Sequence, residues 1–180
     1  GPNIHTYLDA RADPPHVFHP FDASLVACGT GVGAFLGQGT VSELGDVAFL
    51  GNTTAGLVLD DAYAVLLDVN ASLNGWVPRD DSSPAPFLDG PDCAGGIHAR
   101  EGSSVLGLDV TVSENFPVGL LAVDSFVTVY SLSSYFTGSW TGGWGDGVLG
   151  MRSDLILGDF DISRAARAGL LLSASLANLF

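Results

Sequence analysis

The segment VLGLDVTVS at residues 105–113 is the part of the sequence from which the fold is predicted. Its β-branched and leucine side chains surround a single charged residue, Asp109, and this composition is typical of a β-strand. The segment FVTVY at residues 126–130 has the same character. Short apolar runs of this kind recur between glycine, proline, asparagine and aspartate residues, at 24–28, 46–50, 56–59, 63–69, 105–112, 119–123, 126–132 and 154–157. Many short strands with frequent turns predict an all-β fold.

The turns between these runs shape the predicted topology. Asp60-Asp61 and Asp124-Ser125 each separate two apolar runs, and both pairs are predicted to close β-hairpins; for Asp124-Ser125 the alternative is a polar pair inside one long bent strand. We see no internal repeat of fixed period. The pattern therefore predicts an antiparallel β-sandwich of the jelly-roll type, with at most one short helix.

The expected helix covers residues 161–168, where Asp161 provides an acidic N-cap, alanines follow, and Gly169 ends the segment. The chain's 24 glycines break up the other windows that are long enough for several helical turns. Residues 170–180 could continue this helix or form a strand, and the alternation of serines with apolar residues favours the strand.

The length of 180 residues and the hydrophobic fraction of 47% are typical of one domain. Residues 1–15 end in Asp13-Pro14-Pro15 and are predicted to form an extended arm, because consecutive prolines disfavour helix; terminal disorder is the alternative. Residues 16–180 are predicted to form the β-sandwich domain, and 78–96 its longest loop.

The chain is strongly acidic, with 20 aspartates and glutamates against six arginines, no lysine and a net charge of −14. This charge repels nucleic acid and anionic lipid, so neither is expected as a partner. A salt-rich source would explain the bias, because concentrated salt screens repulsion among carboxylates; a GC-rich genome is the alternative. Only 14% of the residues are charged, so small or apolar residues must cover much of the surface, where neighbouring subunits could bury them.

A few features of the sequence bear on compartment and processing. No apolar stretch reaches the roughly 20 residues of a transmembrane helix and no signal peptide is visible, so membrane insertion is not expected. Gly1-Pro2 is either a cleavage scar or a natural start after removal of methionine. Cys28 and Cys93 permit one disulfide or two buried thiols.

Motifs for catalysis and cofactor binding do not assemble in this sequence. GTGVGA at 29–34 superficially matches the dinucleotide fingerprint, but the glycine-rich continuation at 35–40 disfavours the required helix, so a β turn or bulge is predicted. The absence of lysine excludes a P-loop and Schiff-base chemistry, and no Gly-x-Ser-x-Gly elbow occurs. We therefore expect no enzyme activity and no cofactor.

Histidine and carboxylate side chains offer the chemistry of a metal site at His16, His19 and Asp22, with His98 distant in sequence. Residues three apart on a strand point to opposite faces, however, and the flanking prolines disfavour a helix. No metal site is therefore expected.

Aromatic side chains concentrate between residues 130 and 147, where Tyr135, Phe136, Trp140 and Trp144 lie among glycines, serines and threonines. Aromatic residues are enriched at subunit contacts, so these four are candidates for a protein interface. Their flat rings would equally suit a sugar-binding platform. The alternative is that the rings pack into the domain's own core.

These observations favour a structural, self-assembling subunit, most specifically a capsid protein of a virus infecting a halophilic host. Its expected partners are copies of itself or other coat or surface proteins, and its expected location is the virion or an extracellular surface. The second hypothesis is a carbohydrate- or cell-surface-binding module, such as a spike or appendage domain. The third and weakest is a metal-dependent β-barrel enzyme that uses His16, His19 and His98.

Overall fold

The computed structural model describes residues 25–28, 32–37, 39–52, 54–75, 95–138 and 145–180, and these ranges contain thirteen strands and no helix. The all-β prediction is therefore confirmed. One sheet, called the wide sheet below, contains in spatial order β1 (Leu25–Cys28), β3 (Val41–Leu50), β5 (Tyr63–Ser72), β7 (Ser104–Thr111), β9 (Phe126–Tyr135), β11 (Asp154–Ser163) and β13 (Leu176–Leu179). The other, called the narrow sheet, contains β2 (Val32–Gly37), β4 (Ala55–Asp60), β6 (Gly95–Arg100), β8 (Val118–Val123), β10 (Asp146–Met151) and β12 (Ala168–Ser173).

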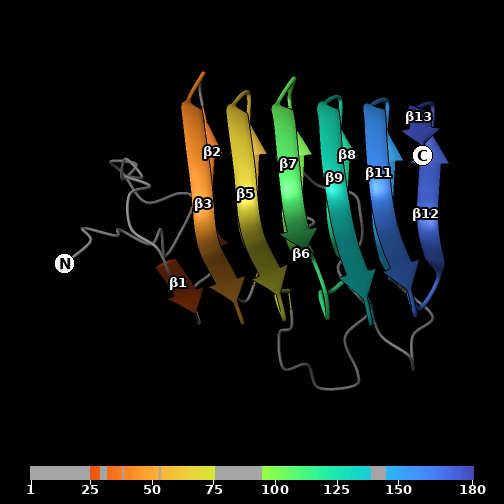
Figure 1. The fold of residues 1–180 in the computed structure, drawn as a ribbon, viewed down its shortest axis with the longest axis horizontal. Coiled ribbons are helices and arrows are strands. Elements are labelled where there is room, and N and C mark those ends of the chain that lie inside the picture. Colours follow the sequence, from red (N-terminus) through yellow and green to blue (C-terminus); the bar gives the residue numbers. More distant parts are fainter. Residues whose placement is uncertain (1–24, 29–31, 38, 53, 76–94, 139–144) are drawn as a thin grey trace.

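Every strand pairing in the described ranges is parallel, so the predicted antiparallel jelly-roll sandwich is wrong. The chain alternates between the two sheets, and consecutive strands of one sheet lie side by side. Figure 1 shows the two sheets stacked face to face, with the strands following the sequence from one end of the molecule to the other. Each circuit through both sheets is thus one coil of a parallel β-solenoid.

The coils have a common length that the sequence conceals. Val41 pairs with Tyr63, 22 positions further on, and the same step of 22 joins Ser104 to Phe126. The step from Tyr63 to Ser104 is 41, and that from Phe126 to Asp154 is 28. The prediction that no repeat exists is therefore wrong, because insertions of 19 and 6 residues interrupt a period of 22.

Turns occur at Asp61 and Asp124, as predicted, but they do not close β-hairpins. Asp61 and Asp124 adopt the left-handed conformation, with φ of 52° and 49°, which aspartate tolerates better than most residues. They connect β4 to β5 and β8 to β9, and these strands belong to different sheets. The turns are therefore solenoid corners and not β-hairpins, because each strand pairs with the next coil and not with its neighbour in sequence.

The helix expected over residues 161–168 is also wrong. Asp161 lies in β11, where it pairs with Ser133 of β9. Arg164 then forms a corner with φ of 56°. Pairing with the preceding coil outweighs the local helix signal, as tertiary contacts commonly do. Residues 170–180 are strand and not helix, as predicted, but they form two strands, β12 and β13, which lie in different sheets on either side of a corner at Ala174.

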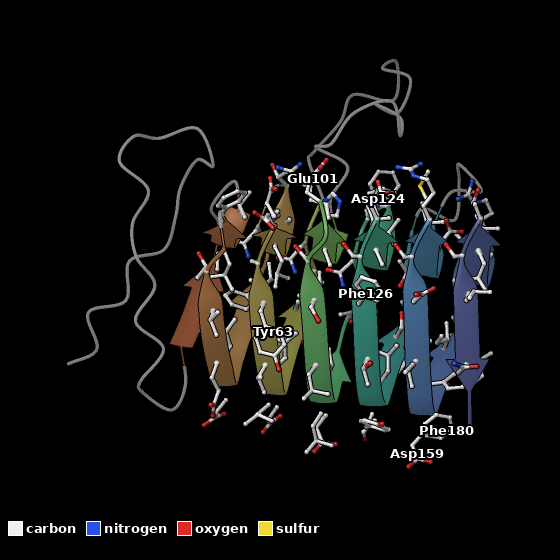
Figure 2. The ribbon with its side chains drawn as sticks, turned by 90° about the horizontal axis from the view of Figure 1, so that it is seen from above. Tyr63, Glu101, Asp124, Phe126, Asp159 and Phe180 are labelled. Carbon is white, nitrogen blue, oxygen red and sulfur yellow. The ribbon has the colours of Figure 1, made fainter. Side chains whose placement is uncertain are left out.

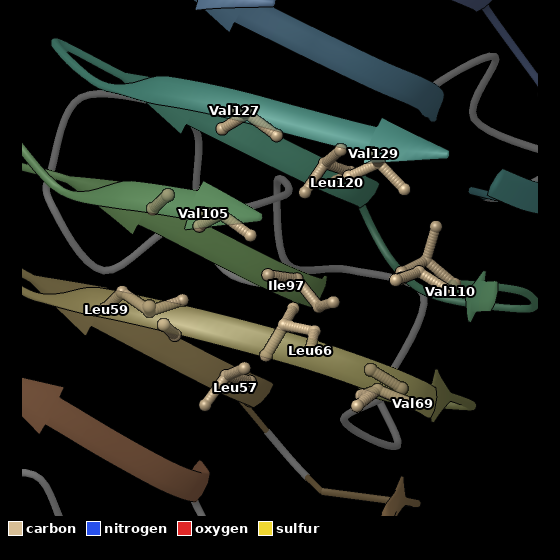
Figure 3. Close-up of a cluster of buried hydrophobic side chains, with 14 of the residues drawn as sticks. Leu57, Leu59, Leu66, Val69, Ile97, Val105, Val110, Leu120, Val127 and Val129 are labelled. Carbon is tan, nitrogen blue, oxygen red and sulfur yellow. The ribbon is translucent and has the colours of Figure 1, made fainter. Parts of the chain in front are cut away.

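The core lies between the two sheets, in columns of side chains that repeat from coil to coil. Leu66 of β5 and Val129 of β9 belong to one column on the wide sheet. Leu57, Ile97 and Leu120 form a facing column on the narrow sheet. Figure 3 shows these side chains meeting between the layers. Apart from Phe49, the core side chains are aliphatic, and each coil depends on its neighbours for burial.

Asparagines link the first coils through one corner. The Asn74 side-chain oxygen accepts hydrogen bonds from the backbone N–H and the side-chain amide of Asn52, at 3.0 and 2.8 Å. The Asn115 oxygen accepts the same pair of bonds from Asn74, at 2.9 and 3.1 Å. The Asn74 and Asn115 amides also donate to the carbonyls of Phe49 and Ala71. We call these three residues the Asn ladder; in later coils Thr137 and then Ala165 follow at the same corner position.

Glycine leaves the room that the Asn ladder needs. A Cβ atom on Gly56 would lie 2.9 Å from the Asn74 amide nitrogen and 2.7 Å from the Gly96 carbonyl oxygen. A Cβ atom on Gly96 would lie 2.6 Å from the Asn115 amide nitrogen and 2.4 Å from the Gly119 carbonyl oxygen. The narrow sheet can therefore approach the ladder only where its strands carry glycine.

Serines satisfy the backbone at the opposite corner. The Ser153 hydroxyl accepts the Ser125 N–H at 3.1 Å, and the Ser175 hydroxyl accepts the Ser153 N–H at 3.0 Å. The Ser103 hydroxyl accepts the Ala62 N–H in the same way, at 3.2 Å. Within the described ranges, no buried side-chain polar atom lacks a hydrogen-bond partner. The corners are thus stabilised between coils, which makes the stack a regular and stiff platform for its surface residues.

Candidate contact surfaces

The outer face of the wide sheet carries a patch of large apolar side chains on three adjacent strands. Side chains alternate along a strand, so the neighbours of the buried residues point outward. The outward residues are Tyr63 and Leu67 on β5, Leu106 and Leu108 on β7, and Phe126 and Tyr130 on β9. All six are exposed, and Phe126 is the most exposed at 59%. We call these six residues the contact face. Figure 2 labels two of them, Tyr63 on β5 and Phe126 on β9, and β7 lies between these strands.

The contact face extends toward the last coil through aromatic rings. The ring centroids of Tyr130 and Phe180 lie 6.0 Å apart, in a tilted arrangement. Gly158 lies between these strands, and a Cβ atom there would approach the Tyr130 ring to 2.8 Å and the Phe180 ring to 3.0 Å. Glycine at this position therefore lets the two rings lean together across β11.

A column of acidic side chains borders the contact face. Asp46, Asp68, Asp109 and Asp159 are exposed at equivalent positions of β3, β5, β7 and β11, and Ser131 of β9 takes the same place. All five residues have positive φ, between 46° and 62°. At this position the strand bulges and its alternation changes phase, so that Leu44 and Val47 both point inward around Asp46. The bulge explains why aspartate occurs here, since aspartate tolerates the left-handed conformation.

The arginines of the described ranges each contact the preceding coil. Arg100 pairs with Asp60 at 2.8 Å, and Arg152 donates to both carboxylate oxygens of Asp124, at 2.7 and 2.5 Å. Arg167 makes a similar two-bond contact with the buried Asp146. The guanidinium carbon of Arg164 lies 4.7 Å from the centre of the Phe136 ring, a cation–π distance. Each of these four arginines therefore links its own coil to the preceding one.

The ion pairs of Arg152 and Arg167 shift the pKa values of three groups, Asp124, Arg152 and Arg167. The hydrogen bonds from Arg152 hold the pKa of Asp124 below its ordinary value, and the Asp124 carboxylate raises the pKa of Arg152. The hydrogen bond to Asp146 likewise raises the pKa of Arg167. Figure 2 shows Asp124 on the same side of the molecule as Glu101, whose charge also raises the pKa of Arg152. Both shifts within the Asp124–Arg152 pair favour its charged forms, so this corner contact persists near neutral pH.

The aromatic residues singled out from the sequence are only partly brought together. Tyr135 is half-buried at the end of β9, and Phe136 is exposed in the corner that follows, beneath Arg164. Trp140 and Trp144 lie outside the described residues, so the predicted four-residue platform stays a prediction. The sequence analysis did not predict the contact face. The sequence does contain a signal for it, because residues 63–67 and 105–108 are apolar at consecutive positions, which is typical of parallel strands with two apolar faces.

Of the metal and disulfide candidates, only His98 and Cys28 lie within the described residues. His98 is buried in β6, whereas His16, His19 and Asp22 lie outside the described residues. In the ranges that the structure describes, no three histidine, cysteine, aspartate or glutamate side chains converge as metal ligands would. Cys28 belongs to β1, and Cys93 lies outside the described residues, so their pairing stays open.

None of the described segments forms a helix that is long and apolar enough to cross a membrane. Comparison with family models, with curated proteins and with solved structures finds no match to this chain. The class of the protein therefore follows from its strand topology and register, which define a two-sheet parallel β-solenoid of 22-residue coils.

Proposed function

We propose that this protein is a structural subunit that works by surface contact, using the contact face to bind copies of itself or another coat or surface protein. The observation that carries the proposal is the contact face itself. Six large apolar side chains are exposed together on a flat sheet, in a chain of net charge −14. An exposed apolar patch on an otherwise acidic protein is favourable only when a partner covers it.

The construction of the stack supports a scaffolding role. The Asn ladder, the corner serines and the arginine pairs all join one coil to the next. Such a stack holds its outward side chains on strands about 4.8 Å apart, so that the contact face stays flat and preorganised. Preorganisation lowers the entropy that association would otherwise cost.

Carbohydrate binding is the second candidate function. Tyr63, Phe126 and Tyr130 present three aromatic rings on the contact face, with the acidic column alongside. Flat rings beside polar groups suit the mixed apolar and polar faces of a sugar. The capsid role, the halophilic host, the virion or extracellular location and the absence of enzyme activity remain predictions from sequence.

The proposal is tested by measuring the mass of the protein by light scattering, in low and in multimolar salt, with the double variant Leu106→Ser/Leu108→Ser. Both side chains point away from the core, so the fold is expected to survive, and circular dichroism checks this. We expect assemblies of the wild-type protein, or its complex with a coat or surface protein, to be lost in the variant.

A matched control is Ser133→Ala, which changes a residue of the same sheet outside the contact face. It should leave assembly unchanged. Assembly that survives Leu106→Ser/Leu108→Ser would refute the contact face as the binding surface. Glycan binding that is lost in Tyr63→Ala/Phe126→Ala, with assembly intact, would favour the second candidate.

A further inference from the structure

The acidic column lies directly beside the apolar residues of the contact face. Asp68 follows Leu67 in β5, and both are exposed. Asp109 follows Leu108 in β7 in the same way, and Tyr130 of β9 pairs with Leu108. An apolar row and a charged row therefore run side by side across the strands, along the axis on which the coils stack, called the stack axis below (Figure 1).

The carboxylates of the acidic column have no ion-pair partner in the described ranges. The ion pairs there join arginines to Asp60, Asp124 and Asp146, and none of these three belongs to the column. Like charges on adjacent strands repel one another, so a partner that brings cations to the column gains attraction and also relieves this repulsion. Charge complementarity therefore favours a partner that combines apolar side chains with cations.

A second copy of this chain cannot supply these cations. The sequence contains no lysine. All four arginines of the described ranges already link one coil to another. Arg11 and Arg79 lie outside the described residues and are too far apart in the sequence to stand on one strand or helix. The partner is therefore expected to be a different chain.

The spacing of the acidic column selects the secondary structure of this partner. Adjacent strands lie about 4.8 Å apart, so successive positions of the column have roughly this spacing along the stack axis. A helix lying along the axis presents one side chain per turn, about every 5.4 Å, whereas an extended chain presents same-face side chains about every 6.6 Å. Over the four strand steps from Asp46 to Asp159, the helix drifts from the column by about 2.4 Å and the extended chain by about 7 Å. Only the helix keeps its cations within reach of the column.

The width of the surface also matches a helix. Leu106, Leu108 and Asp109 lie within three residue steps on β7, which is about 10 Å of strand. A helix with its side chains is about 10–12 Å in diameter. A helix resting on Leu108 would therefore cover Leu106 on one side and reach Asp109 on the other.

We propose that the contact face binds a basic amphipathic helix of another protein, which lies across the strands along the stack axis. Its apolar side chains cover Leu67, Leu108 and Tyr130, and one lysine or arginine per turn reaches the acidic column. No cation is needed opposite Ser131, where the column carries no charge. This inference rests on the proposed function, because it names the partner of the same face.

The first test uses a synthetic leucine–lysine peptide as the probe. The peptide has about 18 residues, enough to form a helix, with lysines along one flank of a leucine face. The control peptide has the same composition in a scrambled order, which removes the leucine face. Titration calorimetry with the full chain should show at least tenfold tighter binding of the amphipathic peptide. Equal binding would indicate general attraction to an acidic protein and would overturn the proposal.

Two double variants of the protein remove the same number of charges from different places. Asp68→Asn/Asp109→Asn neutralises the middle of the column, and asparagine tolerates the positive φ of both positions. We expect it to weaken binding of the amphipathic peptide at least tenfold. Asp61→Asn/Glu101→Gln is the matched control, because it removes two exposed charges at the corners, and it should leave binding within about twofold. Equal effects would show that only net charge matters and would refute the acidic column as part of the surface.

The orientation of the helix is tested by NMR with a nitroxide label at either end of the peptide. A helix along the stack axis places its ends over different strands, so one label should broaden amide signals of β3 and the other those of β11. A helix that follows the strand direction would place both labels over the same strands. Broadening of the same strands by both labels would therefore refute the proposed arrangement.

The inference and the proposed function fail separately. Leu106→Ser/Leu108→Ser should abolish binding of the amphipathic peptide, because it removes apolar surface beneath the helix. If this variant abolishes self-assembly of the chain but both peptides bind equally, the contact face stands and its helical partner is refuted. If the variant changes neither assembly nor peptide binding, the proposed function and the inference are both refuted.

Discussion

The first and the last coils of the stack are built on the same plan, but they differ in what covers and links them. Leu36 and Leu172 hold the same interior position on the narrow sheet, and Leu36 is buried whereas Leu172 is exposed. The Asn ladder joins the coils of β3, β5 and β7, while Ala165 takes the ladder position at the end of β11. The stability of a coil therefore comes from its neighbours and not from its own residue pattern.

The largest expected difference between coils is the loss of stability when the same leucine side chain is truncated in a middle coil and in the last coil. Leu66 and Leu179 stand in one interior column, but Leu66 is fully buried whereas Leu179 is 47% exposed. Leu66→Ala should lower the free energy of unfolding by about 3 kcal/mol or more, because it leaves a cavity. Leu179→Ala should cost less than about 1 kcal/mol in dilute monomeric protein, since little burial is lost. Urea unfolding measures both, and equal losses would show that the last coil is as well covered as the middle.

Alanine substitutions at two glycines compare the stability cost of an added Cβ atom beside the Asn ladder and on the outer side of a coil. Gly96→Ala would force a Cβ atom to 2.4 Å from a carbonyl oxygen, and we expect a loss of about 2 to 3 kcal/mol. At Gly45 the nearest heavy atom is 4.0 Å away, so Gly45→Ala should change stability by less than about 0.5 kcal/mol. Thermal unfolding of the two variants distinguishes them. A tolerated Gly96→Ala would mean that the narrow sheet does not approach the ladder this closely.

The Asn ladder is tested at its middle member. Asn74→Ala removes the partner of the Asn52 N–H and of the Phe49 carbonyl inside the stack, and we expect a loss of about 2 kcal/mol. Asn178→Ala, in the exposed last strand, should cost less than about 0.5 kcal/mol. Hydrogen exchange should also show faster opening of the first coils in Asn74→Ala alone. Similar exchange in both variants would argue against the ladder as the link between these coils.

The smallest effect is expected in the acidic column. Asp68 lies between Asp46 and Asp109 on adjacent strands, so Asp68→Asn should relieve repulsion and stabilise the protein by a few tenths of a kcal/mol in low salt. Asparagine tolerates the same positive φ. Ser131→Asp, which adds a charge between Asp109 and Asp159, should have the opposite sign. Both effects should vanish in melting curves at about 1 M salt; effects that persist there would exclude charge repulsion as their cause.

Local features of this fold were predictable because they depend on neighbouring residues. The run at 63–69 lies within β5, and the pair Asp124-Ser125 forms a turn, as the residue pattern indicates. The contact face was less accessible to prediction, because Leu67, Leu108 and Tyr130 are far apart in sequence and become neighbours only through the coil register. Conversely, the aromatic cluster in sequence did not predict the aromatic cluster on the sheet.

Residue type and local conformation alone account for the all-β class, for the corners at Asp61 and Asp124 and for the acidic, lysine-free composition, but they did not predict strands β2, β6 and β10. Only the tertiary structure decided that the strands pair in parallel, that residues 161–168 form strand and corner instead of helix, and that coils of 22 residues stack around two insertions. The physical reason is that an aspartate corner such as Asp61 suits either a hairpin or a solenoid. The choice between them is made by packing between coils, where ladders of asparagine, serine and leucine find their equivalents in the next coil.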